Sequence, residues 1–366
     1  MKFSISKTDF LDALSIASKG RSSRATLPIL SGVYISATSE GLVFHSTDLE
    51  INVRHEVSAL VEEPGETVVS GRLITDIVKS LPDAAIQCSV ESDRFNISCM
   101  NSSFSMTTMS PKDFPSFPDL QCEDSIELPA ASISKMVKKV SKAISRDESH
   151  VILTGIYLQA DGEELTMAAT DSYRLAMCEL KIEGHEGQFE LVVPGTTFDD
   201  VCKLAGKEET IEIGYNDNQI RFKFGNSTLI TRKIEGNYPN YRQIIPVEKT
   251  VTATIDTKAI VDAVKRVSIM AQEYMQIKLQ VIPDTQQIMI SSKAAEVGGA
   301  EEVIDAQIEG EEIAIGFNYQ YLMDGLVSID SDEVVFEANK PLKPGVLRNI
   351  GGEKFFYLSM PVSIGN

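Results

Sequence analysis

The sequence predicts an α+β protein in which one unit of roughly 120 residues is repeated three times, each copy with two helices and about eight antiparallel strands. Two observations lead to this prediction: matched segments recur at a constant offset, and short alternating segments outnumber helical ones in every copy. The 366 residues are also more than one ordinary hydrophobic core organises, which favours several domains. A repeat of this kind is more typical of a scaffold than of an enzyme.

The repeat is clearest between the first two copies. Residues 32–37 (GVYISA) reappear as residues 155–160 (GIYLQA), and a Thr-Asp pair follows each segment at the same distance. Further along, Asp76 and Asp200 stand about 124 residues apart, and Asp324 continues the series. The third copy is fainter because the Gly-x-Tyr signature is lost there, although the alternation survives. One register kept over so many positions indicates an internal repeat.

Each copy begins with a short alternating strand, predicted at residues 2–6, 125–129 and 250–255. A helix follows, and Ser132 and Asp256 are the expected N-caps in the second and third copies. The apolar residues at helical spacing predict the buried faces of these helices. They are Phe10, Leu14 and Ala17; Ile133, Met136, Val137, Val140 and Ile144; and Ile260, Ala263, Val264 and Val267.

Two alternating strands joined by a polar turn come next, as around residues 38–41. The second half of each copy repeats the scheme, with a strand at residues 67–69, 191–193 and 313–316 that leads into a second helix. Because neighbouring strands are joined by short turns, we expect antiparallel sheets. The repeat then predicts three domains, at residues 1–122, 123–248 and 249–366.

The composition is that of a globular protein, with 43% hydrophobic and 24% charged residues. We expect no membrane partner, because the sequence has no apolar run long enough to span a bilayer. The first residues enter a strand pattern directly, without the apolar stretch of a signal peptide, so we expect a cytoplasmic location. The five cysteines, an odd count without CxxC spacing, are expected to be reduced thiols.

No catalytic signature stands out in the chain. Gly65 and Gly71 enclose five residues, but the Lys-Ser/Thr of a phosphate-binding loop does not follow, and a β-strand between turns is the favoured interpretation. His55 and His185 are each followed by glutamate, yet no second histidine completes a zinc-binding motif. Asp48 and Glu50 share one face of a predicted strand, but no carboxylate pair recurs in the second copy. We therefore expect no catalytic residue, no metal and no cofactor.

Positive charge is gathered on predicted helices although the net charge is -19. Between residues 132 and 146 there are five basic side chains and no acidic one, and the equivalent helices of the other copies are also basic. On a single helix this pattern fits a solvated face, but its recurrence favours a surface for the phosphates of duplex DNA. Such contact would be independent of base sequence. The predicted DNA contacts are Arg24, Arg72, Lys79, Lys138, Lys142, Arg146, Lys203, Lys207, Lys265 and Arg266.

Several segments together resemble the bacterial β sliding clamp, the beta subunit of DNA polymerase III. They are residues 26–30 (TLPIL), 169–176 (ATDSYRLA), 237–241 (NYPNY) and 315–318 (IGFN), with Met360-Pro361 near the end. The resemblance covers essentially the whole chain. It implies a crescent of three tandem clamp domains that closes as a head-to-tail homodimer into a six-domain ring around DNA. It also implies a non-catalytic processivity factor of DNA replication.

The resemblance further implies a hydrophobic groove between the second and third copies. There the family binds short linear motifs of the replicative DNA polymerase alpha subunit, the clamp loader, other polymerases, and mismatch-repair and ligase proteins. Tyr173 replaces a histidine and Gln243 an arginine of the usual pattern, and Arg174 could alternatively serve as an ion-pair partner. By similarity the groove residues are Leu153, Thr170, Tyr173, Arg174, Leu175, Pro239, Ile244, Asn318, Tyr321, Leu342, Pro344, Met360, Pro361 and Val362.

By similarity, Phe104 and Met106 of the first copy would meet Ile269 and Met270 of the third copy in the dimer interface. The alternative for these four residues is that they belong to ordinary cores. Two other functions remain open from the residues alone: a peptide-binding scaffold without nucleic acid, and an enzyme with a diffuse site. The direction in which the basic helices face distinguishes the first of these from a clamp.

Overall fold

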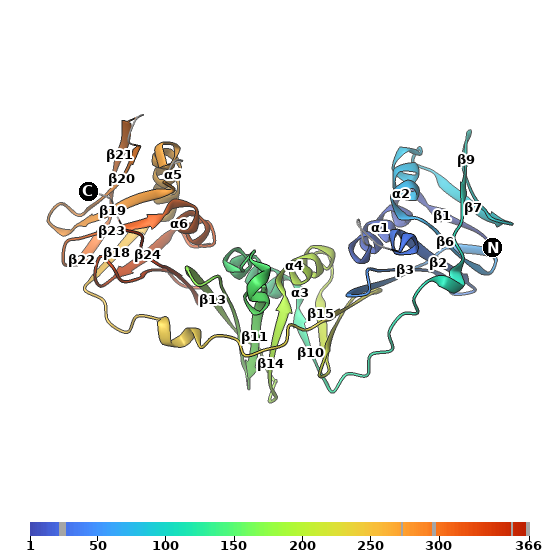
Figure 1. Cartoon of the computed structure of the whole chain (residues 1–366), viewed down its shortest axis with the longest axis horizontal. Helices are drawn as coiled ribbons and strands as arrows, with labels where there is room; N and C mark the ends of the chain where they lie inside the picture. The colour runs from blue at the N-terminus through green and yellow to red at the C-terminus, as the bar shows by residue number, and fades with distance from the viewer. Residues whose placement is uncertain (22–26, 272–273, 295–297, 353, 364–366) are drawn as a thin grey trace. The chain divides into compact units, whose positions relative to one another are not determined.

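The computed structural model describes the whole chain except residues 22–26, 272–273, 295–297, 353 and 364–366 (Figure 1). Six α-helices and 26 strands lie in the described part, and every strand pairing there is antiparallel. The predicted α+β class with locally paired strands is therefore confirmed.

The chain divides into two compact units. The first joins Met1–Ala131 with Asp200–Lys233, and the second joins Ser132–Asp199 with Ile234–Asn366. The limits of these units fall inside the second copy of the repeat. The reason is that strands of the second copy are built into the sheets of both its neighbours.

In the first unit an eight-stranded sheet joins the first copy to the second. Strand β17 pairs with β4 from Ser227 opposite His55 to Thr231 opposite Ile51. The strand order is β10 (Asp124–Pro129), β15 (Thr210–Tyr215), β16 (Gln219–Phe224), β17 (Ser227–Arg232), β4 (Ile51–Val57), β3 (Gly41–Thr47), β2 (Gly32–Thr38) and β6 (Gly65–Ser70).

A five-stranded sheet lies in the same unit, in the order β5 (Leu60–Glu63), β1 (Lys2–Ser6), β7 (Ala85–Glu91), β8 (Arg94–Cys99) and β9 (Ser102–Thr107). Helices α1 (Lys7–Ala17) and α2 (Gly71–Ser80) lie beside each other (Figure 1). The buried ring of Phe10 links the two sheets, because its centroid lies 6.4 Å from that of Phe3 and 5.8 Å from that of Phe44.

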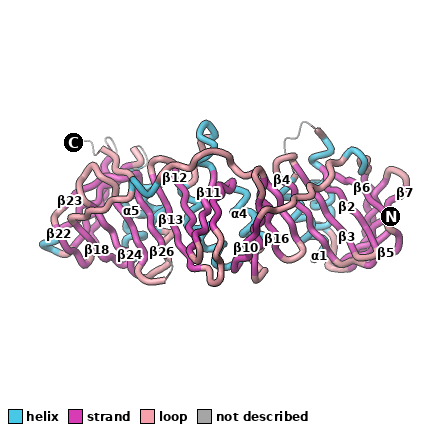
Figure 2. The backbone as a smooth tube through the Cα atoms, turned by 90° about the horizontal axis from the view of Figure 1, so that it is seen from below, coloured by secondary structure: helices cyan, strands magenta, loops and turns pink. Residues whose placement is uncertain are grey.

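In the second unit a nine-stranded sheet joins the second copy to the third (Figure 2). Strand β13 pairs with β26 from Arg174 opposite Ser359 to Glu179 opposite Lys354. The order is β14 (Gln188–Pro194), β11 (Gly155–Asp161), β12 (Glu164–Thr170), β13 (Arg174–Lys181), β26 (Lys354–Ser359), β25 (Gly345–Asn349), β24 (Glu333–Ala338), β18 (Val251–Asp256) and β22 (Gln307–Gly310). Apart from β22, this order read from β18 back to β14 corresponds strand by strand to the eight-stranded sheet read from β10 to β6.

A four-stranded sheet completes the second unit, in the order β21 (Gly298–Asp305), β20 (Gln287–Ala294), β19 (Gln276–Ile282) and β23 (Ile313–Asn318). Helices α5 (Thr257–Val267) and α6 (Tyr319–Leu326) lie next to each other (Figure 1). The second copy contributes α3 (Ala130–Val140) and α4 (Gly195–Leu204). The predicted buried faces of α1, α3 and α5 are at most 1% exposed, and only Ile144, beyond the end of α3, is half-buried.

The two predicted N-caps have different outcomes. Asp256 caps α5 and accepts a hydrogen bond from the backbone N–H of Ala259 at 2.7 Å, as predicted. The prediction for Ser132 is wrong, because α3 begins at Ala130, directly after β10. The Ala130 N–H donates to the Glu209 carbonyl oxygen at 2.9 Å, so a neighbouring segment satisfies it instead of a capping side chain.

Candidate functional site

Arg174 is fixed between two carboxylates where β13 of the second copy meets α6 of the third. Its Nε donates to Asp171 Oδ2 at 2.9 Å, and its Nη1 donates to Asp324 Oδ2 at 2.5 Å. The side chains of Arg174 and Asp171 are only 10% and 11% exposed. Burial disfavours the charged form of Arg174, but the Tyr357 hydroxyl and the two carboxylates outweigh burial and raise its pKa. Arg174 is thus an ion-pair partner, and the pairs fix its position.

Asp171 shapes the turn that presents this arginine. Its Oδ1 accepts hydrogen bonds from the backbone N–H groups of Tyr173 and Arg174, both at 3.0 Å. The Thr170 hydroxyl donates to the Arg174 carbonyl oxygen at 2.6 Å, and Ser172 adopts a φ of 76°. An Asx turn of this kind holds the backbone through the aspartate side chain. It leaves Tyr173 62% exposed.

Tyr173 and Tyr321 form an aromatic pair beside Arg174. Their ring centroids are 6.3 Å apart at an interplanar angle of 24°, and the Arg174 guanidinium lies 4.4 Å from the Tyr321 centroid. Asn318, the N-cap of α6, accepts a hydrogen bond from the Tyr321 N–H at 3.3 Å. The Met360 N–H donates to the Tyr173 carbonyl oxygen at 2.8 Å. The second copy, α6 and the C-terminal segment therefore meet at one place.

An apolar cluster lies at the same junction. Its buried members come from both copies: Tyr157, Ala168, Leu175, Val192, Tyr241, Val346, Phe356 and Leu358. The Tyr238 ring stacks on Tyr157 with centroids 5.0 Å apart, and the Tyr238 hydroxyl accepts a hydrogen bond from the Thr170 N–H. Aromatic and aliphatic surfaces of this kind receive the anchor side chains of short peptides.

The structure brings many of the predicted groove residues together. Thr170, Tyr173, Arg174, Asn318, Tyr321 and Met360 are joined by the contacts above, and Leu175 belongs to the apolar cluster. The Val362 N–H donates to the Gly316 carbonyl oxygen at 2.9 Å, which places the C-terminal segment against β23; Pro361, the residue before Val362, is half-buried. Leu153 is buried and Pro239 exposed, whereas Ile244 and Leu342 remain 47% and 75% exposed.

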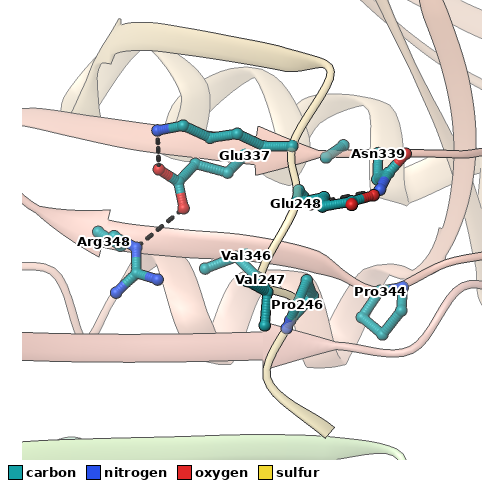
Figure 3. Close-up of a pocket in the computed structure, with 10 residues that line it drawn as sticks. Pro246, Val247, Glu248, Glu337, Asn339, Pro344, Val346 and Arg348 are labelled. Atoms are coloured by element: carbon teal, nitrogen blue, oxygen red, sulfur yellow. Dashed lines mark hydrogen bonds and ion pairs between the residues drawn. The ribbon is translucent and has the colours of Figure 1, made fainter.

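Pro344 lines a separate cavity of about 280 Å³, where the segment around Val247 passes over β24 and β25 (Figure 3). Glu337 lies between two cations: Lys249 Nζ is 2.6 Å from its Oε1, and Arg348 Nε is 2.9 Å from its Oε2. Burial opposes the charge of Glu337, but the hydrogen bonds from the two cations outweigh it and lower its pKa. The sequence did not predict this cavity.

Two basic residues of α3 hold the second and third copies together. Asp330, in the segment after α6, lies 2.7 Å from Lys135 Nζ and 3.0 Å from Lys139 Nζ. Lys139 is 4% exposed and its Nζ lies 5.4 Å from the centroid of Phe355. These lysines therefore bind protein. Lys138, which lies between them in the sequence, is exposed.

The other predicted DNA contacts differ in their surroundings. Arg72 is 90% exposed and 3.9 Å from Asp76. Arg266 donates from both Nε and Nη2 to the Glu302 carboxylate, and Lys142 is half-buried. Arg24 lies outside the described residues. The exposed residues are Lys79, Arg146, Lys203, Lys207 and Lys265.

Comparison with known proteins identifies the family. Family models for the N-terminal, central and C-terminal domains of the DNA polymerase III beta subunit match residues 1–118, 127–240 and 242–363. The chain belongs to the DNA polymerase III beta subunit family. The beta sliding clamp of Staphylococcus aureus (strain Mu50 / ATCC 700699) is 30% identical over 373 residues, which cover 99% of each chain.

Solved structures agree with this assignment. The DNA polymerase sliding clamp of Bacillus subtilis has a TM-score of 0.94 and 29% identity over 100% of both chains. A sliding clamp of Pseudomonas aeruginosa bound to griselimycin has a TM-score of 0.94 and 26% identity over 100% of both chains. The predicted fold of three tandem clamp domains is confirmed. Beta sliding clamps are non-catalytic processivity factors, so this chain is not an enzyme.

The residues predicted for the clamp dimer interface have mixed exposure. Phe104 on β9 is 37% exposed, Ile269 is 65% exposed and Met270 is half-buried. Met106 lies opposite Phe95 in the β8–β9 pairing, is 4% exposed and belongs to the core of the first unit. For Met106 the core alternative holds.

Three further observations concern the described part of the clamp. None of its helices has the length and apolarity that crossing a bilayer requires. No group of three His, Cys, Asp or Glu residues there is arranged to hold a metal ion. Four of the five cysteines are buried, and Cys122 is half-buried.

Several groove residues were missed by the sequence analysis, notably Asp171, Asp324 and Tyr238. Asp324 was recognised only as a marker of the repeat. A usable signal was present, because Asp200, its counterpart in the second copy, also binds a cation: Lys19 Nζ lies 2.7 Å from Asp200 Oδ1. A carboxylate that recurs at copy junctions indicates a structural ion pair.

Proposed function

We propose that this chain is a DNA sliding clamp in which two copies close head to tail into a six-domain ring around duplex DNA and hold replication proteins on it. The match of beta subunit domains along the whole chain carries the proposal. The domains of each crescent would have the limits 1–122, 123–248 and 249–366. A cytoplasmic location remains a prediction from the sequence.

The Arg174 cluster is the proposed docking site for partner motifs. Two features support it: the exposed Tyr173 ring beside Tyr321, and the apolar cluster at the same junction. A short linear motif would place an aromatic or aliphatic anchor there, and its polar groups would face the guanidinium of Arg174. The partners would be the polymerase alpha subunit, the clamp loader, other polymerases, and mismatch-repair and ligase proteins.

DNA contact is assigned to the exposed cations: Arg72, Lys79, Lys138, Arg146, Lys203, Lys207 and Lys265. They would meet phosphates only, so binding would be independent of base sequence. The net charge of -19 disfavours tight binding to DNA, which suits a ring that must move along the duplex. Lys135 and Lys139 are left out of this set because Asp330 holds both.

Ring closure is assigned to two open sheet edges. Strand β9 is an edge of the five-stranded sheet, and β21 is an edge of the four-stranded sheet. An edge strand presents unpaired backbone groups that a partner strand can complete. Val303 on β21 is 48% exposed, and Ile269, two residues after the end of α5, is 65% exposed. Because the two edges are unlike, a head-to-tail contact between copies would close into a ring.

Topological retention on DNA tests the proposal. The chain is loaded on nicked circular DNA with a clamp loader and ATP, the complex is isolated, and the DNA is then linearised with a restriction enzyme. A ring should remain on the circle and slide off the linear product. Retention after linearisation, or loading that is equal on circular and linear DNA, would refute encirclement.

A further inference from the structure

The two junctions between copies have the same strand pairing but different side chains. At the second junction Met177 of β13 lies opposite Phe356 of β26, and both pack in the apolar cluster. The corresponding pair at the first junction is Arg54 of β4 opposite Thr228 of β17. A methionine and a phenylalanine that fill space at one junction are thus replaced by a cation and a small hydroxyl side chain at the other.

The next strand shows the same exchange. At the second junction Val346 of β25 lies opposite Leu358 and belongs to the apolar cluster. At the first junction the corresponding position is Arg221 of β16, opposite Ile230. Two apolar residues of the second junction are therefore arginines at the first, where they lie on one sheet face, on the strands that flank β17.

A cavity of about 460 Å³ lies where these substitutions occur, and Arg54, Arg221, Lys223, Phe117, Leu120 and Ile230 are among its lining residues. All six belong to the first compact unit. A volume of this size lies in the range of sites that take a small ligand or one or two peptide side chains. It exceeds what a single inorganic anion fills.

The polar wall of this cavity has three cations, Arg54, Arg221 and Lys223, and two carboxylates, Glu56 and Asp119. Arg54 Nη2 is 2.8 Å from Glu56 Oε1, and Arg221 Nη2 is 2.7 Å from Glu212 Oε1. In both arginines, however, Nε is buried and has no hydrogen-bond acceptor within the part of the chain that the structure describes. Lys223 adds an exposed cation. Buried donors without acceptors cost free energy, and a carboxylate would supply the acceptors.

The opposite wall is apolar. Leu120 and Ile230 are 6% and 1% exposed, and the Phe117 ring is half-buried with the Arg54 guanidinium 5.9 Å from its centroid. A ligand that places only an anion here would leave this wall uncovered. An anion next to an aromatic or aliphatic group matches both walls.

We propose that the first junction is a second binding site, which takes an acidic peptide of a partner protein. A Glu or Asp side chain of the peptide accepts hydrogen bonds from Arg54 and Arg221, with Lys223 close by, and a neighbouring apolar side chain packs against Phe117. The site is independent of the groove at Arg174. At the position of Arg174 the first copy has Ile51, so the two junctions select different motifs.

Fluorescence anisotropy with a defined probe tests this site. The probe is the blocked, fluorescein-labelled pentapeptide Gly-Glu-Phe-Glu-Gly, and the comparison peptide is Gly-Gln-Phe-Gln-Gly. On the full chain we expect saturable binding of the acidic peptide and at least tenfold weaker binding of the amide peptide. Arg54→Met, which installs the second-junction residue, and the milder Lys223→Gln should each weaken binding of the acidic peptide at least fivefold.

Two matched variants complete the test. Lys112→Gln removes an exposed lysine outside the lining and should change nothing, whereas Arg174→Ala reports on the other groove and should leave this peptide bound. The proposal is overturned if the acidic peptide does not saturate, if Lys223→Gln binds it normally, or if inorganic phosphate displaces it at equal concentration. Loss of binding in Arg174→Ala would place the peptide in the groove at Arg174 and equally refute a second site. Lys223→Gln decides the matter if Arg54→Met does not fold.

Discussion

Asp324 forms an ion pair with Arg174, whereas the repeat would predict a pair between Asp324 and Lys142. At the first junction the corresponding carboxylate, Asp200, is bound by Lys19, and Lys142 is the counterpart of Lys19 about 124 residues later. At the second junction Arg174 occupies the carboxylate instead. Lys142 is left half-buried, where burial lowers its pKa although Asp324 acts in the opposite direction.

Replacing Arg174 should therefore allow Asp324 to form an ion pair with Lys142. In Arg174→Ile, which copies Ile51 of the first junction, we expect the pKa of Lys142 to rise, because a free carboxylate nearby stabilises the ammonium form. The change can be followed by NMR titration of 13C-dimethylated lysines. The signal of Lys2, which pairs with Glu62 in the first unit, is the internal control. An unchanged Lys142 titration would contradict the exchange of partners.

The Arg174 ion pairs should also stabilise the second unit. Arg174→Ala leaves Asp171 with a largely buried charge, so the free energy of unfolding should fall by about 3 kcal/mol. Arg72→Ala is the control, because its pair with Asp76 is exposed and should contribute less than about 1 kcal/mol. Urea denaturation followed by circular dichroism measures both. Equal losses in the two variants would mean that burial of the Arg174 pairs is unimportant.

Neighbouring lysines of α3 should differ in their effect on DNA binding. Lys138 is exposed, so Lys138→Gln should lower the slope of log affinity against log salt concentration by about 1. Lys135 is paired with Asp330, so Lys135→Gln should leave the slope nearly unchanged. Fluorescence anisotropy with a short duplex over a series of salt concentrations distinguishes them. The reverse order would assign DNA contact to the paired lysine.

His45 should make the stability of the first unit depend on pH. The ring is 5% exposed and packs against Phe114 and Phe117, with each centroid 5.1 Å away. Burial lowers its pKa from 6.5 to about 4, with Arg54 acting in the same direction and a hydrogen bond to Asn52 against it. Between these values the unfolded chain binds a proton that the folded chain does not. Stability therefore falls as the pH drops from 6.5 to 4, by on the order of 3 kcal/mol.

Urea denaturation of the wild type and His45→Ala between pH 7 and pH 4 measures this contribution. The alanine copies Ala168, the counterpart of His45 in the second copy, and should reduce the pH dependence over this interval; burial also lowers the pKa of His55, so part of the dependence should remain. His150→Ala, which removes an exposed ring, should leave it as in the wild type. Identical pH profiles for wild type and His45→Ala would exclude the buried histidine as the cause.

Charge on the open edge of β21 should prevent dimerisation. Val303→Lys places an ammonium group on an edge strand, where it disfavours pairing with a second chain, and Ile269→Asp removes exposed apolar surface. Both variants should sediment as monomers at micromolar concentration while the wild type sediments as a dimer. Val247→Lys is the matched control, since Val247 is 99% exposed and lies in the segment between copies. A dimeric Val303→Lys would refute the edge assignment.

Periodicity predicted the elements well and their ends less well. The strand at Lys2–Ser6 has the limits expected from the sequence, and the face of α3 follows from the spacing of Ile133 and Val137. The start of α3 was misplaced because the Ala130 N–H donates to Glu209, far along the chain. Spacing reports which face is buried. It does not report which distant group satisfies the first turn.

The candidate groove was predictable only in part, for a related reason. Tyr173 and Arg174 stand out because the first copy lacks them. Asp171 forms the same turn as Asp48 of the first copy, so the recurring Thr-Asp pair was taken only as a marker of the repeat. The buried position of Lys139 was not predicted, because a lysine-rich helix face is normally interpreted as exposed to solvent along its whole length. Asp330, which binds Lys139, lies in another copy. Ion pairs between copies depend on tertiary contacts that local sequence does not encode.

The pairing of β17 with β4 and of β13 with β26 has a consequence for how the chain can be divided. A fragment of residues 123–248 would expose both β13 and β17 as unprotected edges and lose the partners of its sheets. Excision of one sequence repeat should therefore yield an aggregating fragment, and cooperative opening in hydrogen exchange should follow the two compact units. The copy is the unit of duplication, whereas each unit that folds joins a complete outer copy to about half of the second copy.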